Sequence, residues 1–288
     1  MPALMTKAMV GADFTVGQLL AETVAYKRYF IAYKSGSLTI SGIMNVPKGS
    51  GPFPVIITNH GYIDPAIYTN GRGLKREQDY IASRGYVVIH PDYRNHAESD
   101  DDPDYELSLR LGYTEDVINL ISAIKEAKLD YMDTGKIGML GHSMGGGVTQ
   151  NTLVVKPDLV QAAVLFAPVS SDYTDNFNKW TRGDSDNNRR ELADKIISLY
   201  GSPTSSPEFW ANVSSRTFFD KIQTPILLHH GTADESVPIE WSEESVQALT
   251  DLNKDITFYV YEGEPHEFAA AWPLVMQRTV EFFDQHLK

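Results

Sequence analysis

The stretch KIGMLGHSMGGGV, from Lys136 to Val148, runs from apolar, strand-like residues into a turn crowded with glycine. Residues 141–145 of this stretch fit the pattern G-x-S-x-G, with Ser143 at its centre. In that pattern a strand ends, the chain bends sharply and a helix begins, so that the serine is exposed on the bend. A tight turn built from small residues would explain the same letters, because so short a pattern is common by chance. The rest of the chain has to decide between the two.

The glycines around Ser143 have a geometric explanation if the serine is a nucleophile. A residue on such a bend has strained backbone angles, and its neighbours two positions away come close to it. Side chains at Gly141 and Gly145 would then collide, so glycine is expected at both positions. Gly146 and Gly147 are expected to let the following helix pack closely on the sheet.

Strand-like and helix-like segments alternate along the rest of the chain. Residues 27–47 alternate around a Ser-Gly-Ser turn, which predicts an antiparallel hairpin. A later helix is expected to start at Thr114, with two acids in its first turn. The expected strands after the hairpin lie at 54–59, 86–92, 136–140, 160–168, 224–231 and 256–263, and the expected helices at 73–83, 114–130, from 144, 238–249 and 272–286.

This alternation predicts an α/β fold whose doubly wound sheet is mostly parallel, with antiparallel N-terminal strands. Ligands of such sheets bind beyond the carboxyl ends of the strands. We divide the chain into an N-terminal extension with a first strand (1–33), a catalytic domain (34–169 and 224–288) and an insertion (170–223).

The insertion lacks a clear core strand and is rich in aromatic residues. A structureless loop of that length is improbable in a compact domain, so we expect a helical cap laid over the strand ends. A packed subdomain without substrate contact is the alternative. The residues expected to line a substrate pocket, four from the cap and one beside the serine, are Tyr173, Phe177, Trp180, Trp210 and His142.

An activated serine needs a base, and the base needs an orienting acid. For this architecture the expected order along the chain is serine, acid, histidine. Asp234 follows one expected strand and His266 follows the next, so we expect both to meet Ser143 at the same edge of the sheet. The competing acids and histidines nearby are Glu235, Glu262, Glu264, His229, His230 and His286.

Two backbone N–H groups are expected to stabilise the negative oxygen that forms on the substrate carbonyl. One belongs to Met144, directly after the nucleophile, and the other to Tyr62, in the loop NHGYIDP. The Tyr62 ring could instead line the pocket. His60 in the same loop is expected to stiffen it.

The motifs GHSMGG, NHGY, HGTADESVP and EPHEF together resemble the α/β-hydrolase superfamily, nearest to its dienelactone-hydrolase and prolyl-oligopeptidase-like serine hydrolases. The resemblance runs from about Lys34 to the end of the chain. One departure is the loop DYRNHAESD, which stands where relatives often have Arg-Gly-His-Gly. The resemblance implies acyl transfer through a covalent acyl-serine, with no metal or organic cofactor.

A small-molecule carboxylic ester is the expected substrate. The oligopeptidase relatives have a β-propeller, typically of 4 to 8 blades, for which the chain has no room, and paired glutamates for a peptide amino terminus are not obvious. Small peptides or amides are the second expectation. A non-catalytic binding module of the same fold and an interfacial lipase are further alternatives.

The composition excludes several other classes of protein. The formal net charge is −13, whereas a nucleic-acid binder needs a basic patch. The chain has no cysteine, so disulfides and thiolate catalysis are excluded. The longest apolar runs are far shorter than the roughly 20 residues of a membrane span. The sequence leaves homo-oligomerisation open, as well as location in the cytoplasm or secretion after removal of a signal peptide.

Overall fold

A nine-stranded sheet forms the centre of the computed structural model, which describes residues 1–288. Its strand order is β1-β2-β3-β5-β4-β6-β7-β8-β9. The strands are β1 (Gly11–Glu22), β2 (Tyr26–Ser35), β3 (Leu38–Pro47), β4 (Phe53–Asn59), β5 (Val87–Pro91), β6 (Met132–His142), β7 (Ala162–Phe166), β8 (Ile226–Gly231) and β9 (Ile256–Tyr261).

The sheet is mixed, as expected. β1 to β3 pair antiparallel, β3 also pairs antiparallel with β5, and every pair from β5 through β4 to β9 is parallel. The central strands are continuous apolar runs because both of their faces are covered. β1 is an outer strand whose side chains are mostly exposed, and β2 runs through the expected boundary between residues 33 and 34.

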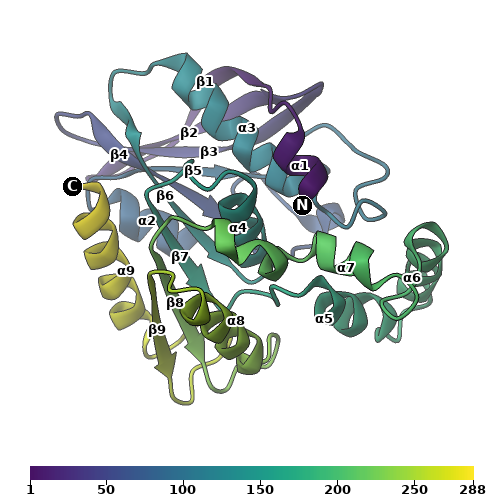
Figure 1. Cartoon of the computed structure of the whole chain (residues 1–288). Helices are drawn as coiled ribbons and strands as arrows, with labels where there is room; N and C mark the ends of the chain where they lie inside the picture. The colour runs from purple at the N-terminus through teal and green to yellow at the C-terminus, as the bar shows by residue number, and fades with distance from the viewer.

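The helices cover both faces of the sheet (Figure 1). α3, α4 and α8 pack in one apolar core, and α2 and α9 pack in the other, on the opposite face. The helices outside the insertion are α1 (Pro2–Thr6), α2 (Lys75–Ala82), α3 (Gly112–Ala127), α4 (Met144–Val155), α8 (Ile239–Asp251) and α9 (Trp272–Leu287), with a short 3₁₀ turn, η1, at Pro65–Ile67.

The insertion at 170–223 is helical throughout its regular structure. Figure 1 shows α5, α6 and α7 as a lobe at the right of the sheet. A small apolar core of its own holds this lobe together and includes Leu109 from the main body. The elements are α5 (Tyr173–Phe177), the π-helix η2 (Asn178–Arg182), α6 (Asn187–Tyr200), α7 (Pro207–Val213) and the 3₁₀ helix η3 (Ser215–Lys221).

The start of α3 differs from the sequence-based expectation. The helix begins at Gly112 rather than Thr114, and no side chain caps its first N–H groups. The two early acids are engaged elsewhere, because Glu115 pairs with Lys7 at 2.6 Å and Asp116 pairs with Arg94 at 2.7 Å. Ion pairs with distant parts of the chain, rather than a local cap, therefore account for these two acids.

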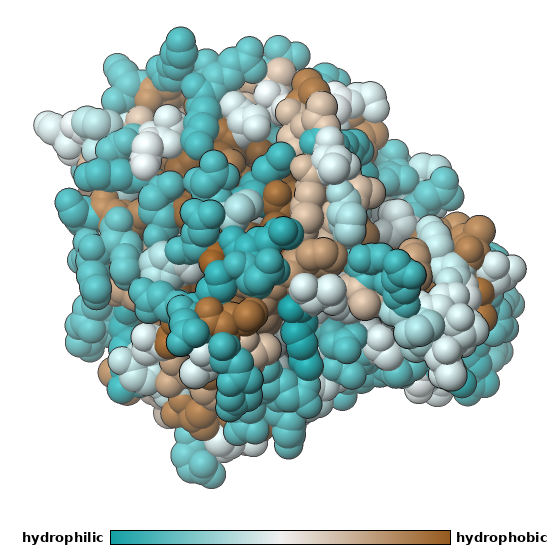
Figure 2. Space-filling model, in the orientation of Figure 1, coloured by the Kyte–Doolittle hydropathy of each residue, from teal (hydrophilic) through white to brown (hydrophobic).

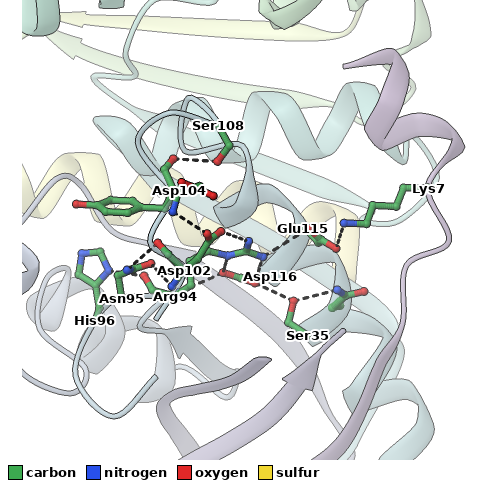
Figure 3. A network of polar contacts seen from close by, with 12 residues as sticks. Lys7, Ser35, Arg94, Asn95, His96, Asp102, Asp104, Ser108, Glu115 and Asp116 are labelled. Atoms are coloured by element: carbon green, nitrogen blue, oxygen red, sulfur yellow. Dashed lines mark hydrogen bonds and ion pairs between the residues drawn. The ribbon is translucent and has the colours of Figure 1, made fainter. Parts of the chain in front are cut away.

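A buried polar network fixes α3 to the loop after β5 and to β2 (Figure 3). We call Arg94, Asp102, Glu115, Asp116 and Ser35 the buried arginine network. The Arg94 guanidinium donates to both oxygens of Asp116, at 3.0 and 2.7 Å, and to Asp102 at 2.9 Å. Glu115 lies 3.5 Å from the same guanidinium, and the Ser35 hydroxyl donates to Asp116 at 2.7 Å. Three carboxylates thus surround one cation.

The face of the molecule that Figure 2 shows, in the orientation of Figure 1, is mainly hydrophilic, with groups of hydrophobic residues between the polar ones. None of the helices has the length and apolar character needed to cross a membrane.

Candidate active site

Ser143 lies on the bend between β6 and α4. Its backbone angles are φ 56° and ψ −120°, a conformation that costs an ordinary residue of the order of 1–3 kcal/mol. A Cβ on Gly141 would lie 2.3 Å from the Gly145 carbonyl oxygen, and a Cβ on Gly145 would lie 2.0 Å from the Asn59 carbonyl oxygen. Neither position can hold a side chain without moving the backbone, as the sequence predicted.

The other two glycines of the turn have a different neighbour from the one expected. A Cβ on Gly146 would lie 2.6 Å from Cβ of Pro168, and a Cβ on Gly147 would lie 2.6 Å from Cγ2 of Val169. Both glycines therefore let α4 pack against the segment that follows β7, rather than directly against the sheet.

Asp234 and His266 meet beside this bend. Nδ1 of His266 lies 2.7 Å from Oδ2 of Asp234, whose side chain is 1% exposed. Because Nδ1 faces a carboxylate, it carries the proton, which leaves Nε2 free to accept one. Ser143 and His266 both line a cavity of about 530 Å³, which residues of the lobe also line. The structure thus brings the three sequence-predicted residues to one place.

The environment of Asp234 keeps it ionised. Its other oxygen accepts the N–H groups of Ser236 and Val237, at 2.8 and 2.7 Å, and Nε2 of His230 lies 3.1 Å from Oδ2. Burial by itself raises the pKa of Asp234, but these hydrogen bonds and the one to His266 outweigh it and lower the pKa. A charged carboxylate is what can hold the imidazole in one tautomer.

The competing acids and histidines have other contacts. Glu264 accepts the N–H of Ala269 at 2.6 Å, and Glu235 contacts the backbone N–H of His266 at 3.3 Å rather than its ring. The ring of His229 meets the Tyr261 hydroxyl at 2.8 Å. Nδ1 of His230, whose Nε2 faces Asp234, lies 2.6 Å from the Ser242 hydroxyl. The ring of His286 packs against Phe282, and Glu262 is exposed in a turn.

The two N–H groups expected to bind a negative oxygen are free within the chain. Neither Tyr62 nor Met144 donates its backbone N–H to a protein acceptor. Met144 is the first residue of α4, where helix geometry leaves N–H groups unpaired. A Cβ on Gly61 would lie 3.2 Å from Cβ of Ser143, so the loop at 60–62 passes directly beside the serine.

A buried aromatic cluster supports that loop. The His60 ring stacks on Tyr93 at 4.4 Å and on Tyr68 at 4.9 Å between centroids. Its nitrogens contact the carbonyl oxygens of Gly61 and Asp92, at 2.7 and 3.2 Å. Burial holds the pKa of His60 well below its usual value, so the ring is neutral. These contacts agree with the expected stiffening role.

The expected pocket residues divide into two groups. Tyr173, Trp180 and His142 line the cavity. Phe177 and Trp210 do not: they are 1% and 2% exposed and pack on each other at 4.5 Å inside the lobe. Their prediction was wrong because the lobe needs an apolar core of its own, and these two rings are part of it.

His142 borders the base directly. Its ring lies 4.5 Å from the ring of His266, and its Nε2 lies 3.1 Å from the His266 carbonyl oxygen. Burial, and then the charge of His266, lower the pKa of His142 to about 4. The residue is therefore neutral near pH 7 and packs beside the proposed base.

The sequence-based prediction missed a group of charged residues in the cavity. Arg110 and Arg189 both donate to Oε1 of Glu106, at 2.7 and 2.6 Å. Glu106 is the last residue of the acidic, turn-rich sequence ESDDDPDYE at 98–106, a composition that by itself predicts a solvated loop. Its spacing of four from Arg110 is the one signal that points to a pair, and no local pattern points to Arg189 on α6.

Comparison with known proteins gives the family. The model of the prolyl oligopeptidase family matches residues 72–288. An uncharacterised peptidase of Bacillus subtilis, YtmA, is 26% identical over 263 residues, which cover 90% of this chain and 93% of that protein. Dipeptidyl peptidase 4 of Sus scrofa is 29% identical over 195 residues, covering 66% of this chain but only 23% of the peptidase.

A solved structure gives the fold. Acetyl xylan esterase 1 from Thermoanaerobacterium sp. superposes with a TM-score of 0.72 at 17% identity, over 96% of this chain and 89% of the esterase. Since the family model covers three quarters of the residues and the sheet has the matching architecture, the chain belongs to the prolyl oligopeptidase family of serine hydrolases, within the α/β-hydrolase superfamily.

Proposed function

We propose that the protein is a carboxylesterase with Ser143 as nucleophile, His266 as general base and Asp234 as the orienting acid. The observation that carries this proposal is the 2.7 Å contact between His266 and Asp234, at a cavity that also exposes Ser143. The residue order and the elbow at Ser143 support it further.

The chemistry follows from the positions of the groups. Oγ of Ser143 attacks the ester carbonyl carbon while Nε2 of His266 takes its proton. The carbonyl oxygen becomes negative and accepts hydrogen bonds from the N–H groups of Tyr62 and Met144. The intermediate expels the alkoxide, which takes the proton from His266, and leaves an acyl-serine. Water, deprotonated by His266, attacks that acyl group, and the carboxylic acid leaves as Ser143 regains its proton.

Two observations favour esters over peptides. Glu106 is already paired with two arginines, so it is not available to hold the ammonium group of a peptide. The likeness to acetyl xylan esterase 1 also extends over 89% of that chain, whereas dipeptidyl peptidase 4 is matched over 23% of its length. Hydrolysis of small peptides or amides is the second candidate, favoured by the match to YtmA, which is named a peptidase.

The test is hydrolysis of 4-nitrophenyl esters from acetate to palmitate, with the 4-nitroanilides of the same acids as amide probes. We expect Ser143→Ala to lower kcat on the order of 10⁶-fold, the scale observed when a triad serine is removed. Ser37→Ala, in the exposed turn between β2 and β3, is the matched control and should retain full activity.

Turnover of anilides without turnover of esters would establish the amide candidate instead. If neither substrate class is cleaved by the wild type, the binding module replaces the enzyme as the best explanation. Residual activity above one part in about 10³ in Ser143→Ala would contradict the assignment of this serine, because loss of a triad serine lowers kcat on the order of 10⁶-fold.

A further inference from the structure

Four residues form a charged group on one wall of the cavity, and we call them the arginine cluster: Tyr62, Glu106, Arg110 and Arg189. The guanidinium of Arg110 lies 4.7 Å from the centre of the Tyr62 ring, and that of Arg189 lies 5.8 Å from it. Arg189 also donates to the Tyr62 hydroxyl at 3.1 Å. All four residues line the cavity.

The cluster has one positive charge more than it can neutralise. Two guanidiniums share Glu106, and both use the same carboxylate oxygen. The remaining hydrogen-bond acceptor of Arg110 is the sulfur of Met144, 3.9 Å from Nη1, and a thioether is a weak acceptor. Each guanidinium has five N–H donors in a planar fork, so most donors of this pair lack a strong acceptor in the chain.

The backbone at Arg110 is strained. Leu109 and Arg110 are consecutive residues with positive φ, 57° and 55°. Residues other than glycine adopt this conformation at a cost of roughly 1–2 kcal/mol each, so two in succession need support from the surrounding structure. Leu109 is buried in the core of the lobe, and this anchor turns the Arg110 side chain into the cavity.

The other two acidic residues of the cavity, Asp184 and Glu267, form no ion pair with the arginines of the cluster, which pair with Glu106. The charge of Glu267 opposes the lowering of the His142 pKa, which agrees with a position near the two histidines. The Asp184 carboxylate accepts a hydrogen bond from the backbone N–H of Asp186 at 3.0 Å in a surface turn. Arg110 of the cluster, by contrast, contacts Tyr62 and Met144, whose backbone N–H groups are the proposed donors to the carbonyl oxygen. The leaving group takes its proton from His266, and no contact joins the arginines to that residue, so we place the acyl part of the substrate against the arginines.

We propose that the arginine cluster is a subsite for a carboxylate on the acyl part of the substrate, so that the preferred substrates are half-esters of dicarboxylic acids. This inference rests on the proposed esterase function and deepens it. A planar carboxylate fits the fork of a guanidinium, and two such forks lie beside the Tyr62 ring.

The test compares two esters that differ only in charge: the mono-4-nitrophenyl ester of adipic acid and its neutral isostere, the 4-nitrophenyl ester of adipic acid monoamide. Spontaneous hydrolysis is subtracted for each. We expect the wild type to have the higher kcat/KM on the charged ester. Arg110→Gln should lower the charged-to-neutral ratio on the order of 10- to 100-fold, the worth of a hydrogen bond to a charged group. Arg110→Lys should retain part of the ratio.

Two further variants fix the interpretation. Glu106→Gln removes the carboxylate that competes for the arginines, so the ratio should rise. Arg190→Gln removes an exposed arginine beside Arg189 that bonds only the carbonyl of Asp184, and it should leave the ratio unchanged. An equal ratio in wild type and Arg110→Gln would overturn the subsite. A preference that depends on Arg110 but appears only with a carboxylate on the nitrophenyl group would overturn its placement on the acyl side.

Binding separates this proposal from the esterase function. Calorimetric titration of Ser143→Ala with adipate and with adipic acid monoamide measures the subsite without turnover. Tighter binding of adipate that disappears in the double variant Ser143→Ala, Arg110→Gln supports the subsite even if no ester is cleaved. Equal affinity for the two compounds would overturn it even if neutral esters are cleaved well.

Discussion

The buried arginine network and the arginine cluster use the same chemistry in opposite proportions. In the network, Arg94 has three carboxylates around it, and its side chain is 9% exposed. In the cluster, Arg110 and Arg189 share a single carboxylate, and their side chains are 23% and 22% exposed. The network ties together β2, α3 and the loop after β5, whereas the cluster lines a cavity (Figure 3 shows the network).

The difference shows that the number of carboxylates per guanidinium distinguishes a structural ion pair from a candidate binding site. A buried cation is tolerated when its donors are matched by acceptors, and Asp116 alone accepts three hydrogen bonds from Arg94, two from the side chain and one from the backbone. A cation that keeps unmatched donors in a cavity is arranged for an acceptor that comes from outside. The predictions below test this contrast.

The largest effect is expected on removing the charge of Asp116. Asp116→Asn leaves Arg94 buried without its main partner, which should lower the free energy of unfolding by about 3–5 kcal/mol. Urea denaturation measures this value. Asp130→Asn, at an exposed position after α3, is the matched control and should change stability by less than about 0.5 kcal/mol. If Asp116→Asn lowers the free energy of unfolding no more than Glu106→Gln does, the contrast between the network and the cluster is contradicted.

A smaller effect on stability is expected from pH, through His96 beside the network and not through the cluster. His96 contacts the Arg94 carbonyl oxygen at 3.0 Å, and burial lowers its pKa below 6.5. The unfolded chain therefore binds the proton first, so the free energy of unfolding falls as the pH falls through 6.5. His96→Gln should make that slope shallower by at most about 1.4 kcal/mol per pH unit. Equal slopes between pH 6.5 and 5 would show that His96 takes up its proton at the same pH in the folded and the unfolded chain.

The cluster should respond at lower pH. Burial by itself raises the pKa of Glu106, but Arg110 and Arg189 outweigh it, so its pKa lies below 4.5. Its contribution to stability is complete above that unfolded-state value and is lost only as the pH falls further. Glu106→Gln should therefore leave the slope between pH 6.5 and 5 unchanged, in contrast to His96→Gln.

The smallest effect is expected for the stability of Glu106→Gln near pH 7. The ion pairs of the cluster are partly exposed, and such pairs contribute about 0–1 kcal/mol. The free energy of unfolding, from the same urea titrations, should thus change by less than about 1 kcal/mol while substrate preference changes. A loss of several kcal/mol would place Glu106 among the structural residues and weaken the case for a ligand site.

The central sheet could be predicted because its strands are continuous apolar runs with clear ends. β1 could not be located, since an outer strand with exposed side chains leaves no apolar run at 11–22. The start of α3 was also misplaced, because Glu115 and Asp116 look like capping acids but serve pairs with residues far along the chain. Local patterns do not report such contacts.

The proposed triad was predictable for a physical reason: Ser143, Asp234 and His266 each follow a parallel strand, and those strand ends meet at one edge. The arginine cluster was not, because its members come from the loop after β4, the segment before α3, and α6. Their meeting depends on how the lobe lies over the sheet. The same dependence explains why Phe177 and Trp210, as prominent in sequence as Trp180, are in the core of the lobe instead of the cavity.

Tyr62 has its backbone beside Ser143 and its ring beside two guanidiniums. Under the proposed chemistry one residue both selects the acyl group and positions a donor for the transition state. A change of its side chain during evolution would then alter recognition and turnover together, whereas changes at Arg110 or Arg189 alter recognition alone. New substrate preferences in this lineage should accordingly arise by replacement of the arginines, with the aromatic residue retained.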